Sequence, residues 1–319
     1  RAGASPVGAD ASSWATATPN LQDAIDAALP GDSVWISQGV YKPSAGTDRF
    51  ATFVLKNGVR LFGGFAGTES QIGQRDWSAY PTILSGDIGV PGDSTDNSFG
   101  ILLVAQTGPG TRVDGLVFEF GNAGNPDNVN VFPRQRTHSG SAIYMDGLGA
   151  GNFARLDIAN CTFRRNRSDY YGAIFANGSD GGQIAVTVDN CLFERNYAYG
   201  RGGGLVVESF SPQTEPLLVS NTVFQENYAF LEGGAAHIEY DRDIYFTDCL
   251  FQKNAAQITG GSAVSLAGYE LANTIHFNSC RLKENRAISI NAAGAINYTT
   301  IGSKTNLRLI DCSGSVDTD

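Results

Sequence analysis

The sequence lacks the features that would suggest a membrane helix, a metal centre or a nucleic-acid-binding protein. It has no run of about 18 apolar residues, so we expect no membrane insertion by this segment. It contains only one Met, three His and five Cys in 319 residues, and no Cys-x-x-Cys pair. The net charge of −10 argues against nucleic acid as a partner.

What the sequence does contain is a repeat. The motif Phe-x-x-Asn occurs at Phe163, Phe193, Phe224 and Phe251, and a fifth copy begins with Leu282. Successive copies are 30, 31, 27 and 31 residues apart. Each is followed by a turn of small residues and then by an apolar strand. A period of this length indicates a solenoid.

The segments between the turns have the chemistry of β-strands. Ile184, Val186 and Val188 alternate with smaller or more polar residues, which is typical of a strand with one buried face. No amphipathic helix of about ten residues separates the copies. We therefore predict an all-β protein, a right-handed parallel β-helix with one coil per repeat.

Equivalent residues of successive coils should form columns about 4.8 Å apart. We expect one column to be a ladder of hydrogen-bonded asparagines, made of Asn166, Asn196, Asn227, Asn254 and Asn285. All five cysteines share another column, in which Thr222 takes the remaining place. Stacked side chains keep nearly the full strand spacing, whereas a disulfide needs Cβ atoms about 3.5–4.5 Å apart. We therefore predict free, buried thiols.

We predict a single β-helix domain over residues 1–319. Its parts are a lead-in and N-terminal cap (1–31), irregular coils (32–120), an inserted loop (121–138) and regular repeat coils (139–319). The cap should contain a short helix over Asn20–Leu29, with Asn20 as its N-cap. Because the last repeat ends near residue 319, we expect more protein to follow it.

The repeats resemble a known family. The Phe-x-x-Asn motifs, with turns such as Gly233-Gly234-Ala235-Ala236, resemble those of the chlamydial polymorphic outer membrane proteins. The phrases GDSVWISQGVYKP, LFGGFAGTE and TILSGD are similar to the opening of large secreted proteins from Bacteroidota-like bacteria. The resemblance implies a secreted or cell-surface β-helix that acts as an adhesin or as a structural interaction module. Its partner would be a cell-surface glycan or protein, or further domains of the same chain.

Loops along one edge of a solenoid often carry its binding site. Three such loops hold an aromatic residue, namely Phe210, Tyr240 and Tyr269. Two interpretations remain open: the rings are platforms for sugars, or they cover the edge of the coils.

The strands that follow the small-residue turns should present a flat, weakly charged face suited to docking. We expect three outward columns on this face. They are Ala173, Gly204, Ala235, Ser262 and Ala295; Phe175, Val206, His237, Val264 and Asn297; and Asn177, Glu208, Glu239, Leu266 and Thr299.

Glu208 and Glu239 should lie on adjacent coils beside His237. The coil spacing of about 4.8 Å is close to the carboxyl separation of about 5–5.5 Å in retaining glycosidases. It also suits calcium. The alternative function is therefore a polysaccharide lyase or glycoside hydrolase of β-helix fold. Since the sequence has no Gly-His-Gly and no Asp-Asp pair, we assign no catalytic residue.

The loop over residues 87–98 is acidic. Asp87, Asp93 and Asp96 are candidate calcium ligands, although their spacing is not that of an EF-hand. The other interpretation is a solvated turn. The sequence indicates no further cofactor.

Overall fold

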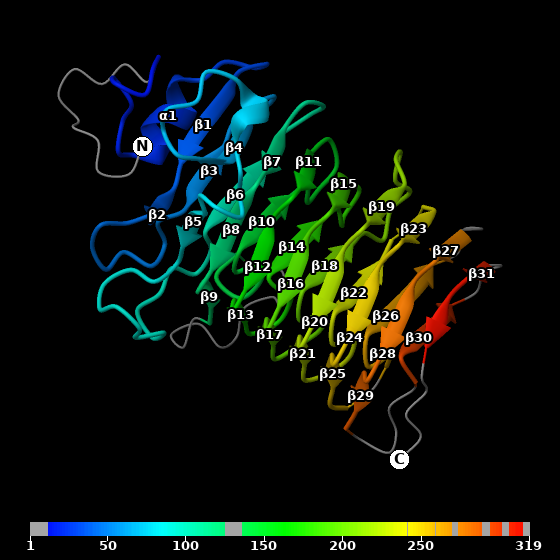
Figure 1. Cartoon of the computed structure of the whole chain (residues 1–319). Coiled ribbons are helices and arrows are strands. Elements are labelled where there is room, and N and C mark those ends of the chain that lie inside the picture. Colours follow the sequence, from blue (N-terminus) through cyan, green and yellow to red (C-terminus); the bar gives the residue numbers. More distant parts are fainter. Residues whose placement is uncertain are drawn as a thin grey trace.

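The structure is a computed structural model that describes residues 12–124, 136–240, 242–258, 260–269, 274–288, 294–301 and 306–314. Within these residues the chain winds into a right-handed parallel β-helix, as the repeat predicts (Figure 1). Three long sheets, A, B and C, run along the helix axis. A fourth sheet, D, is made of two-residue strands.

The strands of each sheet follow one another in chain order. Sheet A contains β1 (Ser33–Ser37), β4 (Arg60–Phe65), β7 (Arg112–Asp114), β11 (Phe153–Ala159), β15 (Gln183–Asp189), β19 (Leu217–Ser220), β23 (Ile244–Thr247), β27 (Thr274–Asn278) and β31 (Asn306–Ile310). Sheet B contains β2 (Gly39–Tyr41), β5 (Thr82–Ser85), β8 (Leu116–Glu119), β12 (Thr162–Arg164), β16 (Leu192–Glu194), β20 (Val223–Gln225), β24 (Leu250–Gln252), β28 (Arg281–Lys283) and β32 (Ser313–Gly314).

The other two sheets complete each coil. Sheet C contains β3 (Phe53–Leu55), β6 (Leu102–Ala105), β10 (Ile143–Asp146), β14 (Ile174–Asn177), β18 (Leu205–Glu208), β22 (Ala236–Glu239), β26 (Val264–Tyr269) and β30 (Ile296–Ile301). Sheet D contains β9 (Asn122–Ala123), β13 (Arg167–Ser168), β17 (Tyr197–Ala198), β21 (Tyr228–Ala229), β25 (Ala255–Ala256) and β29 (Arg286–Ala287). Strand β9 thus belongs to the wall of the helix, although we predicted an inserted loop from residue 121 onward.

Each regular coil bends at two residues that adopt positive φ, a conformation that costs most side chains energy. The first bend, before sheet B, uses Asn160, Asn190, Asn221, Asp248, Ser279 and Asp311, with φ between 50° and 53°. The second, before sheet D, uses Arg165, Arg195, Glu226, Lys253 and Glu284, with φ between 51° and 54°. Because both bends recur at the same place in every coil, the residues after them stay in register.

The phenylalanines of the repeat stack through the core. Phe118, Phe163, Phe193, Phe224 and Phe251 form one column in which neighbouring ring centroids are 5.0, 4.7, 4.7 and 5.0 Å apart. All five rings are fully buried. The repeated Phe therefore builds the core.

The asparagine column lies at the second bend, and each interior member bonds to both neighbouring coils. The Oδ1 atom of Asn227 accepts hydrogen bonds from the backbone N and from Nδ2 of Asn196, both at 3.0 Å. Its Nδ2 donates to Oδ1 of Asn254 at 3.0 Å and to the carbonyl of Phe193 at 2.9 Å. The same pattern runs from Asn166 to Asn285.

The cysteines are free thiols, as predicted, and four of the five are buried. Each thiol donates to the carbonyl two residues earlier, for example Cys161 to Ala159 at 3.1 Å and Cys191 to Asp189 at 3.2 Å. In the coil without a cysteine, the hydroxyl of Thr222 makes the equivalent bond to Ser220 at 2.7 Å. The column therefore requires a short side chain that can donate a hydrogen bond.

A helix covers the first coil. Helix α1 (Leu21–Ala27) begins at the predicted N-cap, where Oδ1 of Asn20 accepts from the backbone N of Gln22 at 3.0 Å. It ends two residues earlier than predicted. Leu21 and Ile25 are buried in the core of the β-helix. In the described part of the chain, no helix has the length and apolar character needed to cross a membrane.

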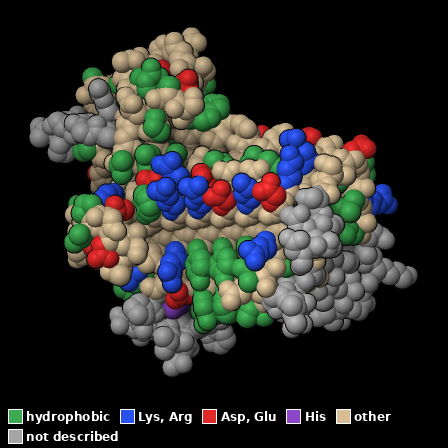
Figure 2. Space-filling view, turned by 60° about the horizontal axis from the view of Figure 1, so that its bottom comes forward, with side chains coloured by type: hydrophobic (Ala, Val, Ile, Leu, Met, Phe, Trp, Pro, Cys, Tyr) green, Lys and Arg blue, Asp and Glu red, His purple; other side chains and the backbone are tan. Residues whose placement is uncertain are grey.

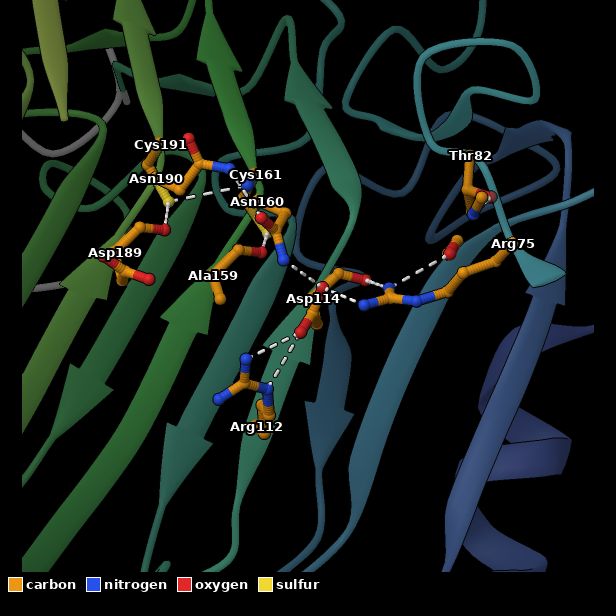
Figure 3. Close-up of polar contacts among 12 residues, drawn as sticks. Arg75, Thr82, Arg112, Asp114, Ala159, Asn160, Cys161, Asp189, Asn190 and Cys191 are labelled. Carbon is orange, nitrogen blue, oxygen red and sulfur yellow. Dashed lines mark hydrogen bonds and ion pairs between the residues drawn. The ribbon is translucent and has the colours of Figure 1, made fainter. Parts of the chain in front are cut away.

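Where the irregular coils meet the regular ones, a buried carboxylate lies between two arginines (Figure 3). Asp114 is 2% exposed. Its Oδ1 atom lies 2.6 Å from Nη2 of Arg75, and its Oδ2 atom lies 2.7 Å from Nη2 of Arg112. Nδ2 of Asn160 donates to the same carboxylate at 2.8 Å, and Nδ2 of Asn190 donates to Oδ1 of Asn160 at 2.7 Å. Asp114 therefore starts a polar column that extends into the next two coils.

The register of one strand differs from our prediction. Strand β26 pairs with β22 so that Ser265 lies beside His237 and Ala267 beside Glu239, whereas we placed Val264 and Leu266 there. Val264 and Leu266 point into the core. A shift of one residue exchanges the two faces of a strand, so the second and third outward columns are correct in β14, β18 and β22 but not in β26. The first outward column is wrong at Ala173 and Ala235, which belong to the core.

Candidate binding surface

An exposed aromatic surface lies on sheet D, directly after the asparagine ladder. Two successive coils read Asn196-Tyr197-Ala198-Tyr199 and Asn227-Tyr228-Ala229-Phe230. The asparagine and the alanine of each coil are buried. Because side chains alternate along a strand, the two aromatic residues of each coil point outward.

The four rings form two stacks across the coils. Tyr197 and Tyr228 have ring centroids 5.0 Å apart and an interplanar angle of 12°, and Tyr199 and Phe230 have values of 4.6 Å and 7°. Stacked rings cover one another's inner faces, and the hydroxyl of Tyr228 donates to Oε1 of Gln257. Tyr199 is 53% exposed.

The ends of the stacks differ. On the Tyr197 side, the guanidinium of Arg167 lies over the ring at 5.1 Å from its centroid. On the Tyr228 side, the next member of the column is the short Ala255 and the one after it is the exposed Arg286. In the next coil Tyr228 therefore has the methyl group of Ala255 beside it in its own column, and its hydroxyl donates to Oε1 of Gln257.

Aliphatic side chains extend this surface. Leu231, Ile258 and Ile288 are 37%, 38% and 47% exposed, and backbone bonds place Gln257 beside Phe230 and Ile258 beside Leu231 in the next coil. Figure 2 shows the result as an apolar patch with basic side chains beside it, below a row of alternating charges. We call this patch the aromatic face; its residues are Arg167, Tyr197, Tyr199, Tyr228, Phe230, Leu231, Ala255, Ile258, Arg286 and Ile288.

The chemistry of the aromatic face suits binding. Tyr, Phe and Arg are enriched at binding surfaces because they combine large apolar area with polar ends. Burial raises the pKa of the Tyr228 hydroxyl, and the hydroxyls of Tyr197 and Tyr199 raise it further. The tyrosine of this site therefore stays uncharged at neutral pH and remains a hydrogen-bond donor and acceptor.

The structure places the loop aromatics differently from the platform interpretation. Tyr240 is 3% exposed and belongs to the core. Its hydroxyl donates to the carbonyl of Glu215 at 2.7 Å. Tyr240 therefore covers the edge of the coils, which corrects its prediction as an exposed platform. Phe210 is 37% exposed, and the side chain of Tyr269 lies outside the described part of the structure.

Glu208, His237 and Glu239 do lie together on sheet C, as predicted, but in a buried network. Glu208 pairs with Glu239 in adjacent strands, and the three side chains are 2–6% exposed. Arg201 contacts Glu232 at 2.7 Å and Glu239 at 3.4 Å. Burial alone would lower the pKa of Arg201, but these two carboxylates raise it above its usual value.

The outward face of sheet C is therefore not the open docking surface that we expected. Tyr144, Tyr171, Phe175 and Val206 form a second apolar cluster on it, each at most 8% exposed. Beside the cluster, Nε2 of His237 lies 3.3 Å from Glu239. Charged side chains at this depth need partners to offset desolvation, and here the carboxylates face Arg201. The geometry resembles a structural ion-pair network more than an open acid–base pair.

The three candidate calcium ligands of the acidic loop serve the loop itself. Asp87 accepts from the backbone N of Gly92 at 3.0 Å, Asp93 from that of Thr95 at 2.9 Å, and Asp96 from that of Val90 at 2.7 Å. Among the residues that the structure describes, no group of three or more His, Cys, Asp or Glu side chains could hold a metal ion. Calcium binding by this loop stays a prediction.

Our reading of the sequence missed the aromatic face, although the signal was present. The positions one and three residues after each ladder Asn are Arg and Asp, Tyr and Tyr, Tyr and Phe, Ala and Gln, and Arg and Ile. Aromatic binding residues were predicted in the loops, whereas the aromatic residues of the aromatic face directly follow the ladder asparagines, the most regular motif of the chain.

In comparisons with known proteins, no protein-family model, curated protein or solved structure matches the chain.

Proposed function

We propose that the chain is an extracellular interaction module that binds a polysaccharide along its aromatic face. The observation that carries the proposal is the outward placement of two aromatic stacks, in which Tyr199 is 53% exposed, with Arg167 and Arg286 at either end of the column that contains Tyr197 and Tyr228. A secreted or cell-surface location is part of the proposal. The Phe-x-x-Asn resemblance to the chlamydial polymorphic outer membrane proteins and to secreted Bacteroidota-like proteins supports it.

The surface offers three kinds of contact to a sugar chain. The outer ring faces of Tyr228 and Tyr199, which end their stacks, can pack against the C–H face of a pyranose. The tyrosine hydroxyls can donate to and accept from sugar hydroxyls. The two arginines bracket the Tyr197–Tyr228 column, and guanidinium groups bind hydroxyl or carboxylate oxygens with paired hydrogen bonds.

The direction of the surface also fits a polymer. Its members repeat every coil along the helix axis, at the usual strand spacing of about 4.8 Å. From Arg167 to Arg286 the column crosses four coil steps, or about 19 Å at that spacing. A chain laid along the axis would contact several coils at once, and weak contacts in series add affinity.

The test is a binding and degradation screen with a panel of neutral and acidic polysaccharides. We expect the purified chain to bind at least one polymer, and we expect Tyr199→Ala and Phe230→Ala each to weaken binding by tenfold or more. Leu218→Ala is the matched control, because Leu218 is 41% exposed on sheet A. Equal binding by all three variants would place the site elsewhere.

The same screen tests the enzymatic alternative. New reducing ends or unsaturated products, abolished by Glu208→Gln or Glu239→Gln, would indicate a glycoside hydrolase or a lyase instead. We expect binding without product, because these carboxylates are buried and Glu239 is paired with Arg201.

A further inference from the structure

A hollow of about 680 Å³ opens at the amino-terminal end of the β-helix. It lies between the lead-in that contains Trp14, the exposed side of helix α1, and the first strand β1 with Trp35. A volume of this size is typical of sites for small ligands, which occupy roughly 300–1,000 Å³. The hollow lies at the first coils, whereas the aromatic face lies on sheet D from β13 to β29.

Two tryptophans form one corner of the hollow. The ring centroids of Trp14 and Trp35 are 6.4 Å apart and the rings are inclined at 47°. Trp14 is fixed by its Nε1, which donates to the carbonyl of Glu69 at 2.9 Å. Trp35 is fixed by stacking on Phe65 at 4.8 Å and 8°. Both indoles remain partly exposed, so the corner is already formed without a ligand.

The charge in the hollow has one sign. Of the lining residues that the structure describes, Asp32 and Glu69 carry carboxylates and none is Lys, Arg or His. Partial burial would raise the pKa of Glu69, but hydrogen bonds from the backbone N–H groups of Ala66, Thr68 and Gly67 lower it overall. Asp32 is exposed and accepts from the backbone N of Leu29 at 2.8 Å. Backbone hydrogen bonds thus hold both of these lining residues in place.

The remaining wall is mixed. Ala24, Ala27 and Ala28 of the α1 region line one side with methyl groups, and Ser12, Ser13, Thr18, Ser33 and Ser70 line other parts of it. A ligand that uses the two indoles, the alanine methyl groups and the two carboxylates together has an apolar surface and a positive charge. Alkylated ammonium ions have these properties, and tryptophan faces bind them better than any other side chain does, through cation–π attraction.

We propose that this hollow binds a small organic cation of the quaternary ammonium class, with its alkylated nitrogen in the corner of Trp14 and Trp35. Asp32 and Glu69 supply the negative potential, and the alanines of α1 contact the alkyl groups. The site is independent of the aromatic face and of the function proposed for it.

The probes are tetramethylammonium and choline chloride, titrated into the full chain at constant ionic strength while tryptophan fluorescence is recorded. The uncharged carbon isostere of choline is titrated in parallel. We expect saturable binding of both cations and at least tenfold weaker binding of the isostere. Absence of a saturable signal with the cations, or equal affinity for the isostere, would overturn the proposal.

Three variants locate the site. Asp32→Asn retains an oxygen for the backbone N of Leu29 and should reduce the preference for cation over isostere several-fold. Trp14→Phe should weaken cation binding several-fold, whereas Trp77→Phe should not, because Trp77 packs on Arg75 outside the hollow. Tyr199→Ala should leave the cation titration unchanged, which separates this site from the polysaccharide surface. Unchanged affinity in both Asp32→Asn and Trp14→Phe would refute the assignment.

Discussion

At the scale of single residues, the asparagine ladder shows how one side chain can connect three coils. Asn227 is 1% exposed. Its side chain makes four hydrogen bonds, two with Asn196, one with Asn254 and one with the carbonyl of Phe193. Its removal would leave donors and acceptors on both neighbouring coils without partners. A buried unpaired polar group costs about 1–3 kcal/mol.

We predict that Asn227→Ala lowers the free energy of unfolding by about 3 kcal/mol or more, since several groups lose their partners together. Chemical denaturation of the two proteins measures this difference. Thr214→Ala, at an exposed position of a loop, is the control and should unfold like the wild type. A melting temperature unchanged by Asn227→Ala would contradict the ladder.

The cysteine column leads to a second prediction at this scale. Burial raises the pKa of the Cys191 thiol well above its usual value, and the neighbouring Cys161 thiol raises it further. The thiolate is the reactive form. The hydrogen bond with the Cys249 thiol lowers the pKa of Cys280 instead, but Cys280 is fully buried, so a thiol reagent should not reach the four buried cysteines in the folded protein. Cys312 is only half-buried and should react first.

Labelling with a chromogenic disulfide reagent, before and after unfolding, counts the accessible thiols. We expect at most one thiol to react in the native protein and all five cysteines to react in denaturant. Cys312→Ser should remove the early fraction. Rapid reaction of several thiols in the native state would show that the column is not packed as described.

The residue scale also shows where sequence reasoning succeeded. The ladder, the phenylalanine stack and the free thiols follow from a residue type that recurs at one place in each coil. The aromatic face escaped because tyrosine occurs at its positions in only two coils. The burial of Tyr240 depends on how its loop folds back against Glu215 and Ile184, and neither contact is near in sequence.

At the scale of secondary-structure elements, the register of the strands depends on the lengths of the turns. Two residues lie between Gly233 and Ala236, the first position of β22, but three lie between Gly260 and Val264, the first position of β26. Our alignment assumed equal turns, which moved Val264 and Leu266 to the wrong face. The repeat thus predicts that a strand exists more reliably than it predicts which way each side chain points.

The junction between irregular and regular coils depends on Asp114. Replacing this carboxylate with an amide leaves Arg75, whose side chain is 10% exposed, without its ionic partner. Breaking a buried ion pair costs about 3–5 kcal/mol. We expect Asp114→Asn to lower the free energy of unfolding by about 3 kcal/mol, the lower end of this range. The loss is at the lower end because the side chain of Arg112 is 35% exposed and can reach solvent.

Urea denaturation measures this loss, with the exposed Asp180 changed to Asn as the matched control. We predict that only Asp114→Asn shifts the unfolding midpoint. Equal midpoints for both variants would mean that the buried cluster contributes little to the stability of the junction.

The amino-terminal turn around Glu69 should be sensitive to acid. The folded-state pKa of Glu69 lies below its ordinary value, since backbone N–H bonds outweigh the effect of burial. A lowered pKa means that the carboxylate stabilises the folded state above the unfolded-state pKa of roughly 4.3. This stabilisation is lost as the pH falls through the folded-state pKa.

Tryptophan fluorescence can follow this transition, because Trp14 donates to the carbonyl of Glu69. We predict that the emission of the wild type changes with acid at a pH below the ordinary pKa of a glutamate side chain. In Glu69→Gln, this change should be absent. An identical pH profile in the variant would assign the transition to another group.

At the scale of the whole molecule, the β-helix is a solenoid whose side chains are arranged in lines parallel to its axis. The sequence allowed the fold class to be predicted because the same Asn recurs in five coils and the same Phe in four of them. It could not indicate which line serves a function, since that depends on outward residues that vary from coil to coil. The structure distinguishes one line, the aromatic face, from the buried network on sheet C.

The most direct test of this account is a calorimetric titration of the chain with oligosaccharides of increasing length, prepared from a polymer that it binds. If the sugar chain lies along the aromatic face, affinity should rise with length until the oligomer spans the coils from Arg167 to Arg286, and then remain constant. Tyr199→Ala should abolish this dependence, and Leu218→Ala should preserve it. Affinity that is independent of length, or equal in the two variants, would contradict binding along the aromatic face.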